Sequence, residues 1–304
     1  MKSYDVLIIG AGPAGLTAAM YAARKELSVI LISPDIGGQI LLTGGIENMP
    51  GFSGIMSFDL VDRLEAQVRK YPVVFETAEV KSLSETETGF CAHLDDGQKI
   101  EAKAAIVTAG RRPRTLGIPG ETALTGHGVS YCATCDGPLY RGKTVAVIGA
   151  GDSAVQAAIE LSEIASQVIL IVRSKISADV ILKKRLAAKE NVEILLGFSP
   201  VAALGDGRLS GLSIKKKDTG EVRDISLDGC FIEAGGVANS GFLPEELSLN
   251  EKGEIVTSRE GETNVPGLFA AGDVTDTPYK QIVIAAGEGA AAALSAADYL
   301  MRQS

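Results

Sequence analysis

Two thiols lie three positions apart in residues 131–138, which read Tyr-Cys-Ala-Thr-Cys-Asp-Gly-Pro. Cys132 and Cys135 can close a reversible disulfide in a tight turn or in the first turn of a helix, where the partial positive charge of the backbone favours a thiolate. Asp136 follows directly and is the titratable group within immediate sequence reach that could carry a proton to and from a leaving thiolate. The stretch therefore predicts a redox-active dithiol with an acid/base partner.

The same cysteine spacing also occurs in half of a zinc site and in inert buried pairs. The remaining cysteines, Cys91 and Cys230, are isolated, and the chain has two histidines, His93 and His127. With no second cysteine pair and two histidines in the chain, a four-ligand zinc site is poorly supported, so we predict no metal site. We expect both isolated cysteines to act as small buried apolar side chains.

Composition narrows the class of protein. The chain has 304 residues, of which 46% are hydrophobic, and a formal net charge of −9 at pH 7. This length suits one large or two ordinary domains, and the negative charge argues against binding to nucleic acid or an anionic membrane. No apolar run reaches about 18 residues and no charged leader precedes Tyr4, so we expect neither a membrane span nor a signal peptide. A single close pair of cysteines fits a cytoplasmic setting, where such a pair is catalytic more often than structural.

The first element that could position a ligand is a strand, glycine turn and helix near the N-terminus. Residues 5–9 are an apolar run rich in β-branched side chains, and a glycine turn and a helix with small residues follow. In this dinucleotide-binding pattern one glycine makes the tight turn, the next lets the backbone approach a pyrophosphate, and the third lets helix and strand pack closely. The turn residues are Gly10, Gly12, Pro13, Ala14 and Gly15. The acid expected about 20 residues later is absent from the strand end, where Ser33 stands, and Asp35 is the nearest candidate.

The pattern repeats after the cysteine pair. Residues 144–148 predict a buried strand, the helix after the turn runs to about residue 165, and residues 167–172 predict the next strand. The third glycine is replaced by alanine, a common variant. Two such turns predict two nucleotide-type ligands, or one ligand and a relic site. The turn residues are Gly149, Gly151, Asp152, Ser153 and Ala154.

The rest of the chain divides into short strands, linkers and two helices. Residues 56–71 and 281–301 have the periodicity of helices, and the segments 111–120 and 235–241 have the composition of linkers. We expect an antiparallel layer set into the first unit, a final strand there, and three strands in the smaller unit. The antiparallel layer comprises residues 73–75, 79–83, 89–94 and 99–102, and the final strand of the first unit is residues 104–109. The three strands of the smaller unit are residues 191–196, 209–216 and 225–234.

A carboxylate follows the last predicted strand. The strand delivers Asp273 to a turn at Gly272, which is how a carboxylate is offered to the hydroxyls of a bound ribityl chain, although a plain surface turn gives the same pattern. The small residues of the following helix would let its N-terminus press onto a flat ligand. A tightly packed structural helix is the alternative.

With these motifs in place, the chain resembles the low-molecular-weight thioredoxin reductase family over essentially its whole length. It also looks like the flavoprotein component of alkyl hydroperoxide reductase without that protein's N-terminal thioredoxin-like extension. The resemblance rests on residues 10–15, 37–39, 47–48, 132–137, 149–154, 267–273, 278–281 and 287–289.

The resemblance implies an α/β fold of two Rossmann-like dinucleotide-binding domains, with the second inserted in the first. Residues 1–113 and 243–304 would bind FAD, and residues 114–242 would bind NADPH or NADH and carry the cysteines. It further implies a homodimer, a thioredoxin-like protein substrate, Cys135 against the flavin, Asp136 as acid/base, and an inserted domain that swings between two orientations. Beyond the turn residues, the FAD contacts would be Asp35, Gly38, Gln39, Asn48, Gly110, Gly272, Asp273, Lys280, Gln281 and Ile282.

One segment departs from the family pattern. Members that use NADPH carry His-Arg-Arg-x-x-x-Arg after the second strand of the inserted domain, whereas residues 172–179 read Val-Arg-Ser-Lys-Ile-Ser-Ala-Asp. Arg173 keeps one arginine of the pair, and with Lys175 it is the candidate contact to the nucleotide. The strand end also lacks the acidic residue that would favour NADH. Three other hypotheses therefore stay open beside a nicotinamide-driven disulfide reductase: the same reductase fed by ferredoxin or another flavin, a dithiol oxidase that uses oxygen, and a redox-sensing flavoprotein.

Overall fold

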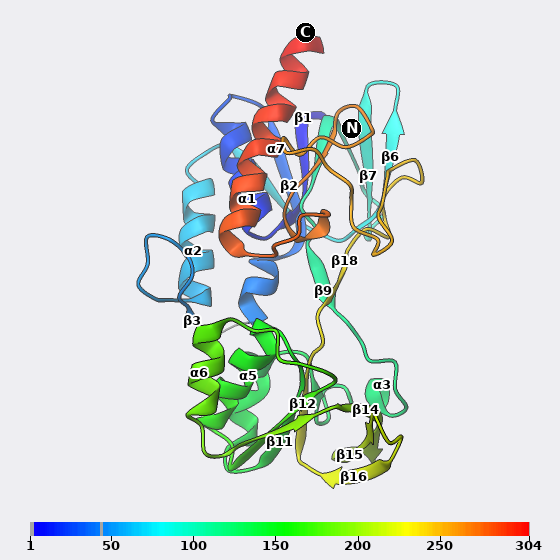
Figure 1. Cartoon of the computed structure of the whole chain (residues 1–304). Coiled ribbons are helices and arrows are strands. Elements are labelled where there is room, and N and C mark those ends of the chain that lie inside the picture. Colours follow the sequence, from blue (N-terminus) through cyan, green and yellow to red (C-terminus); the bar gives the residue numbers. More distant parts are fainter. Residues whose placement is uncertain (1–2, 43–44, 304) are drawn as a thin grey trace. The chain divides into compact units, whose positions relative to one another are not determined.

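The computed structural model describes residues 3–42 and 45–303, and the chain divides into two compact units (Figure 1). Unit 1 comprises Met1–Arg112 and Val237–Ser304, and unit 2 is the intervening Pro113–Gly236. Both points of division lie within the segments predicted as linkers, residues 111–120 and 235–241. Within the described residues, no helix combines the length and the apolar character needed to cross a membrane.

Unit 1 is built on a mixed sheet with the strand order β5-β2-β1-β8-β7-β6, and β19 also pairs with β8. β1 is parallel to β2 and β8, whereas β7 is antiparallel to both β6 and β8. The strands of this sheet are β1 (Ser3–Ala11), β2 (Val29–Ile36), β5 (Val73–Thr77), β6 (Val80–Thr86), β7 (Gly89–Leu94), β8 (Lys99–Val107) and β19 (Leu268–Ala270). A small separate hairpin pairs β3 (Gly45–Ile46) with β4 (Ile55–Met56).

Two expectations for these strands were wrong. Residues 73–75 do not join the antiparallel layer: β5 pairs in parallel with β2, and Val73 lies opposite Val29. Residues 99–102 and 104–109 are not two strands but the single strand β8. Its first residues pair antiparallel with β7, and the strand then continues in parallel along β1 as far as Val107. Because one strand serves both partners, there is no break between residues 102 and 104.

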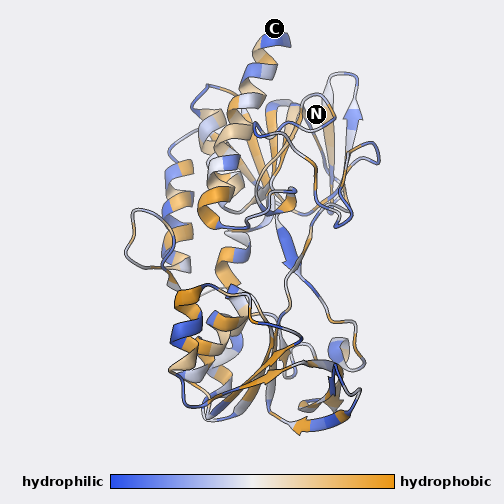
Figure 2. Cartoon of the chain, viewed as in Figure 1, coloured by the Kyte–Doolittle hydropathy of each residue, from blue (hydrophilic) through white to orange (hydrophobic). Residues whose placement is uncertain are grey.

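Both faces of this sheet are covered. The apolar run of β1 alternates between two cores, since Val6 and Ile8 pack on one face and Leu7 and Ile9 on the other. Small buried residues of α1 (Pro13–Ala23) and α7 (Ile282–Gln303) fill the first core and let these two helices lie close together. α2 (Ser57–Val68) has the amphipathic pattern predicted from the sequence, and Leu60 and Val61 are buried. Figure 2 shows the apolar strands inside unit 1 and helices along which apolar and polar residues mix.

Unit 2 has a five-stranded parallel sheet with the order β10-β17-β11-β12-β13 and a three-stranded antiparallel sheet. The parallel strands are β10 (Val129–Ser130), β11 (Thr144–Gly149), β12 (Gln167–Val172), β13 (Val192–Leu196) and β17 (Gly229–Glu233). The antiparallel strands are β14 (Phe198–Gly205), β15 (Leu209–Lys216) and β16 (Val222–Ser226). The helices are α3 (Glu121–Leu124), α4 (Ala133–Asp136), α5 (Asp152–Ser162) and α6 (Val180–Ala187), and the 3-10 turn η2 (Gly137–Tyr140) follows α4.

Sequence patterns described the antiparallel sheet poorly. No strand was predicted over β14, whose run contains a proline, a residue uncommon within sheets. The structure accommodates Pro200 through an irregularity in the pairing with β15 between Pro200 and Ala202. The predicted strand 225–234 is two strands: β16 ends at Ser226, and β17 starts at Gly229 in the other sheet.

The two chain segments that cross between the units are short strands. β9 (Arg111–Pro113) and β18 (Gly236–Ala238) pair with each other as a two-stranded sheet. Both lie in segments that the sequence predicted as linkers. The crossings therefore have a regular extended backbone.

Candidate active site

Cys132 and Cys135 form a disulfide across a single helical turn. Their Cα atoms are 5.4 Å apart, and Cys132 lies immediately before the first residue of α4. The Sγ of Cys132 accepts a hydrogen bond from the backbone N–H of Cys135 at 3.1 Å. Cys132 is buried and Cys135 is exposed. The predicted disulfide in a helical turn is confirmed.

The residues around the disulfide are acidic and hydroxyl-bearing. Asp136 is the last residue of α4, and its backbone N–H donates to the carbonyl oxygen of Cys132 at 3.2 Å. Tyr131 and Thr134 each donate a side-chain hydroxyl to a carboxylate, that of Glu121 and that of Glu160 respectively. The sequence analysis missed both glutamates, because neither lies within a recognisable motif. We call residues 131–136 the redox turn, and it is held by side chains from α3 and α5.

A further carboxylate, the half-buried side chain of Glu233, lies near Glu160. Glu233 ends β17, where it is the Cα partner of Gly149 in β11. Burial, with a smaller contribution from the charge of Glu160, raises the pKa of Glu233 to about 7. The carboxyl ends of these strands therefore carry a group that titrates near neutral pH.

The two isolated cysteines are buried free thiols, as expected. Burial raises the pKa of the Cys91 thiol, and it raises the pKa of Cys230 further. A raised thiol pKa leaves little of the reactive thiolate. Neither residue competes chemically with the disulfide pair.

The glycine turn of unit 1 has the geometry that a dinucleotide needs. Gly10 has a φ of +107°, and a Cβ on Gly15 would lie 1.8 Å from the carbonyl oxygen of Gly10. A Cβ on Gly12 would meet nothing nearer than an oxygen at 4.0 Å, and one on Gly38 would come no nearer than 3.7 Å to the backbone of Gly12. Gly10 and Gly15 are thus glycines for packing, while Gly12 and Gly38 border open space above the turn.

The start of α1 adds donors to this space. Pro13 is the first helical residue, Ala14 follows, and no side chain caps the helix. Uncapped N–H groups at the start of an eleven-residue helix are suited to phosphate oxygens. Thr108, which the sequence analysis missed, fixes the turn from the neighbouring strand end: its hydroxyl lies 2.9 Å from the Ile9 carbonyl oxygen and 2.8 Å from that of Gly10.

The other residues predicted to contact FAD also lie in unit 1. Asp35 accepts a hydrogen bond from the Gly38 N–H at 3.0 Å, so one of its carboxylate oxygens stabilises the turn that precedes the 3-10 helix η1 (Gly38–Leu42). Gln39 is the second residue of η1. The side chains of Asn48 and Gln281, far apart in sequence, are joined by a 2.9 Å hydrogen bond. Gly110 follows β8 with a φ of +61°, and a Cβ there would meet nothing within 4 Å.

Asp273 sits just beyond β19, in the 3-10 turn η3 (Gly272–Val274). Its side chain accepts no hydrogen bond from the described residues, and burial raises its pKa against the opposing charge of Lys280. Lys280 donates to the carbonyl oxygen of Thr275 and lies 3.5 Å from a carboxylate oxygen of the buried Glu254. Ile282, the first residue of α7, packs against a small apolar cluster.

The small residues of α7 have a packing role that the sequence indicated. A Cβ on Gly289 would lie 2.1 Å from the Ala14 carbonyl oxygen, so the close approach of α7 to α1 requires glycine there. Glu288, on the same helix, accepts the Gly272 N–H at 2.8 Å and the hydroxyl of Thr277. Glu288 thereby fixes the turn that presents Asp273.

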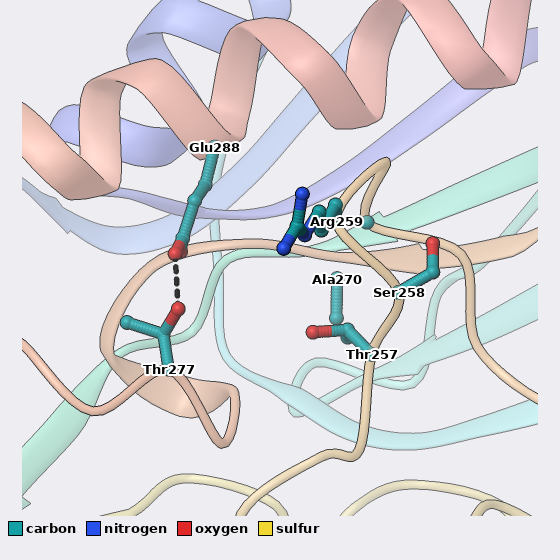
Figure 3. A pocket seen from close by; sticks show the side chains of 7 residues that line it. Thr257, Ser258, Arg259, Ala270, Thr277 and Glu288 are labelled. Carbon is teal, nitrogen blue, oxygen red and sulfur yellow. Dashed lines mark hydrogen bonds between the residues drawn. The ribbon is translucent and has the colours of Figure 1, made fainter.

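A separate small cavity of about 210 Å³ lies beside this turn in unit 1 (Figure 3). Figure 3 shows Glu288 reaching Thr277 from α7, with Arg259 and Ser258 on the neighbouring loop. None of the residues predicted to bind FAD or to form the disulfide lines this cavity. It is therefore distinct from the candidate site.

The glycine turn of unit 2 has the same two kinds of glycine. A Cβ on Gly149 would lie 2.2 Å from the Glu233 carbonyl oxygen and 2.6 Å from the Cβ of Ala154, whereas one on Gly151 would meet nothing within 4 Å. Asp152 and Ser153 begin α5. Asp152 accepts the Asp179 N–H at 2.7 Å, which ties the loop after β12 to this turn. Arg173 and Lys175 lie exposed on that loop.

These observations fit two dinucleotide-type ligands. Open space beside Gly12 and Gly38, the uncapped start of α1 and the Asp273 carboxylate, which accepts no bond from the described residues, are suited to a pyrophosphate and to ribityl hydroxyls. Gly151 and the start of α5 offer the same backbone chemistry in unit 2.

Comparison with known proteins agrees with this arrangement. The family model described as pyridine nucleotide-disulphide oxidoreductase matches residues 4–289. The chain belongs to this family. It is an oxidoreductase of that class, and the prediction of an α/β fold with two Rossmann-like units is confirmed. FAD and a nicotinamide nucleotide are the cofactors of the family, as the sequence predicted.

The chain is similar to individual proteins of both kinds that its sequence resembles. An alkyl hydroperoxide reductase component of Pseudomonas putida is 41% identical over 308 residues, which cover 100% of this chain and 59% of that protein. Lactococcus lactis thioredoxin reductase has a TM-score of 0.96 and 35% identity, covering 98% of this chain and 99% of its own. The T. acidophilum thioredoxin reductase gives a similar result, with a TM-score of 0.93 and 35% identity over 100% of both chains.

Proposed function

We propose that this member of the pyridine nucleotide-disulphide oxidoreductase family reduces the disulfide of a thioredoxin-like protein through Cys132 and Cys135. The observation that carries the proposal is their disulfide, which lies in the same unit as the second glycine turn and has one exposed cysteine. The net reaction is NAD(P)H plus H⁺ plus a partner disulfide, giving NAD(P)⁺ and a partner dithiol. Two electrons leave the nicotinamide, and two thiols form on the partner.

The chain's own residues divide this work between the units. We assign FAD to unit 1, held by the glycine turn at residues 10–15, the Asp35–Gln39 segment, Asn48, Gly110, and residues 272–273 with 280–282. Bound FAD supplies a two-electron acceptor that can also deliver electrons to a disulfide. A thiolate of the reduced pair attacks the partner disulfide, and the second cysteine sulfur then resolves the mixed disulfide. Asp136, at the end of the same helical turn, is the candidate carrier of the proton.

We assign the nicotinamide nucleotide to Gly149, Gly151 and residues 152–154 of unit 2. Arg173 and Lys175 are the cations available for a 2′-phosphate, but the histidine and the downstream arginine of the NADPH pattern are absent. That absence supports a second candidate for the donor, ferredoxin or another flavin, with the same disulfide chemistry. Relatives that are components of alkyl hydroperoxide reductase likewise support a peroxidase-linked carrier as the second class of partner.

The donor and the partner are tested in one experiment. Protein reconstituted with FAD is titrated anaerobically with NADPH, NADH or reduced ferredoxin while the visible flavin band is followed, and turnover is then measured with thioredoxin and with a peroxidase-linked carrier. We expect one nicotinamide to bleach the band and thioredoxin to be reduced. Bleaching by ferredoxin alone would overturn the nicotinamide assignment. Oxygen uptake driven by small dithiols, without thioredoxin turnover, would instead support a dithiol oxidase.

The proposal includes a homodimer, as the family resemblance implies. Sedimentation equilibrium of the holoprotein measures its mass directly. A mass of one chain across the micromolar range would contradict this part of the proposal without affecting the disulfide chemistry.

A further inference from the structure

The redox turn is attached to the rest of unit 2 by two similar hydrogen bonds. Tyr131 precedes Cys132, and its hydroxyl donates to Oε1 of Glu121 at 2.6 Å. Thr134 lies between the cysteines, and its hydroxyl donates to Oε2 of Glu160 at 3.2 Å. Each residue thus bonds to a carboxylate on a different helix, α3 or α5.

Glu121 is a rigid anchor. Its side chain is 3% exposed and accepts the backbone N–H groups of Leu116, Gly117 and Ile118 at 2.8, 2.7 and 3.3 Å. Burial alone would raise the pKa of Glu121, but the bonds from Tyr131 and these amides outweigh it and lower the pKa. Burial, followed by the hydrogen bond to the same carboxylate, raises the pKa of Tyr131 to about 12. At neutral pH the bond therefore joins a neutral phenol to a carboxylate, a charge-assisted hydrogen bond.

Glu160 is anchored in a different way. Its other oxygen accepts the side-chain amide of Gln156, one turn earlier on α5, at 3.1 Å. α5 itself is fixed by its apolar face, since Val155, Ala158 and Leu161 are buried in the core of unit 2. A bond to Glu160 therefore ties Thr134 to an element that is held in place independently of the disulfide.

We propose that the Tyr131–Glu121 and Thr134–Glu160 bonds hold the redox turn in the geometry of its disulfide while that disulfide is open, and so favour its closure. The inference rests on the proposed function, because it concerns the same pair of sulfurs. Closing a disulfide within one chain depends on the effective concentration of its two thiols, which rises when both are kept in place. A pair that closes more readily is the stronger reductant. Tyr131 and Thr134 are thus positioning residues, and the two bonds make the pair more reducing.

Thiol–disulfide exchange with dithiothreitol measures how readily the pair closes, and this reaction needs no electrons from a bound nucleotide. The open pair and oxidised dithiothreitol exchange two electrons and two protons to give the Cys132–Cys135 disulfide and reduced dithiothreitol. One S–S bond forms in the protein and one breaks in the reagent. The fraction of closed pair, measured across dithiothreitol redox buffers, gives the equilibrium constant.

The test compares full-length holoprotein variants in these buffers by acid quenching, alkylation and mass spectrometry of the cysteines. Thr134→Val and Tyr131→Phe should each lower the constant for closure about threefold, and the double variant about tenfold, as loss of one or two such bonds predicts. Thr134→Ser, which keeps the hydroxyl, should restore the wild-type value to within about twofold. Ser213→Ala is the matched control, because it removes a hydroxyl-to-carboxylate bond, to Asp224, in the antiparallel sheet of the same unit.

Failure of this inference differs from failure of the proposed function. Equal constants in wild type, Thr134→Val and Tyr131→Phe, in variants whose thermal unfolding shows them folded, would overturn the positioning role. An equal change in Ser213→Ala would overturn it as well, since the effect would then be general to the unit. A wild-type pair that does not exchange with dithiothreitol at all would overturn the proposed function and the inference with it.

Discussion

At the scale of single residues, the redox turn is set among carboxylates. Asp136 belongs to the turn, Glu121 and Glu160 bond to its neighbours, and Glu233 lies close enough to Glu160 for the charge of one to affect the other. Nearby negative charges disfavour a cysteine thiolate. Because a stabilised reduced form makes a cysteine pair a strong oxidant, these carboxylates make the Cys132–Cys135 pair less oxidising. The sequence identified the cysteines and Asp136 by spacing, but the glutamates come from α3, α5 and β17, and only folding brings them to the turn.

The first residue-scale prediction concerns Cys135→Ser. This variant cannot form the disulfide, so disulfide reduction should fall to background while the flavin stays reducible by its donor. Turnover of thioredoxin and bleaching of the flavin band measure the two outcomes separately. Cys91→Ala, in the sheet of unit 1, should retain both activities. Loss of flavin reduction in Cys135→Ser would contradict the assigned electron path.

The second residue-scale prediction concerns Glu233. Its folded pKa of about 7 exceeds the ordinary value of 4.5, so the folded state binds the proton more tightly than the unfolded chain does. The free energy of unfolding therefore falls as pH rises through this window, and the full cost is present above the folded pKa. Glu233→Gln removes that cost, and it should stabilise the protein by about 1–3 kcal/mol at pH 8 while giving little gain at about pH 4.5.

Denaturant unfolding of wild type and Glu233→Gln between these pH values measures the difference. Glu190→Gln is a matched control, since Glu190 is an exposed carboxylate of the same unit. A stabilisation that did not depend on pH, or one shared by the control, would show that ionisation of Glu233 is not its cause.

At the scale of elements, the glycine turns were the part of the fold that sequence could predict well. Gly10, Gly15 and Gly149 are required by backbone contacts that any side chain would violate, so their spacing carries real structural information. Strand pairing was harder to predict. β5 and β6 are neighbours in sequence, yet β5 extends the parallel edge while β6 lies in the antiparallel layer. Pairing depends on which strands meet in space, and local patterns do not encode that.

The element-scale prediction separates packing glycines from ligand glycines. Gly15→Ala should destabilise the apoprotein by about 2–4 kcal/mol, because its Cβ would overlap the Gly10 carbonyl oxygen. Gly12→Ala has room for its Cβ, so it should change stability by less than about 0.5 kcal/mol, yet weaken FAD binding at least about tenfold by occupying the space assigned to the pyrophosphate.

Denaturant unfolding of the apoproteins and fluorescence titration with FAD measure these two effects. Each variant is the control for the other. If Gly12→Ala bound FAD as tightly as wild type, the turn of unit 1 would not be the pyrophosphate site.

At the scale of the whole molecule, the repeated glycine turn predicted two nucleotide-type units, and the family resemblance implied that one is inserted in the other. The return crossing was predicted as a linker at residues 235–241, and within it residues 236–238 form β18 and pair with β9. Similarity to known proteins then showed the class of enzyme. The donor was harder to predict, because Arg173 keeps one arginine of the NADPH pattern whereas the histidine and the downstream arginine of that pattern are absent.

The central claim is that electrons from the donor reach Cys132 and Cys135. The most direct measurement adds the donor anaerobically to FAD-reconstituted protein, quenches with an alkylating agent under native conditions, and locates the label by mass spectrometry. We predict that the exposed Cys135 becomes labelled only after donor addition, while the buried Cys91 and Cys230 stay unlabelled throughout. A fully reduced flavin with Cys135 still unlabelled would contradict the account.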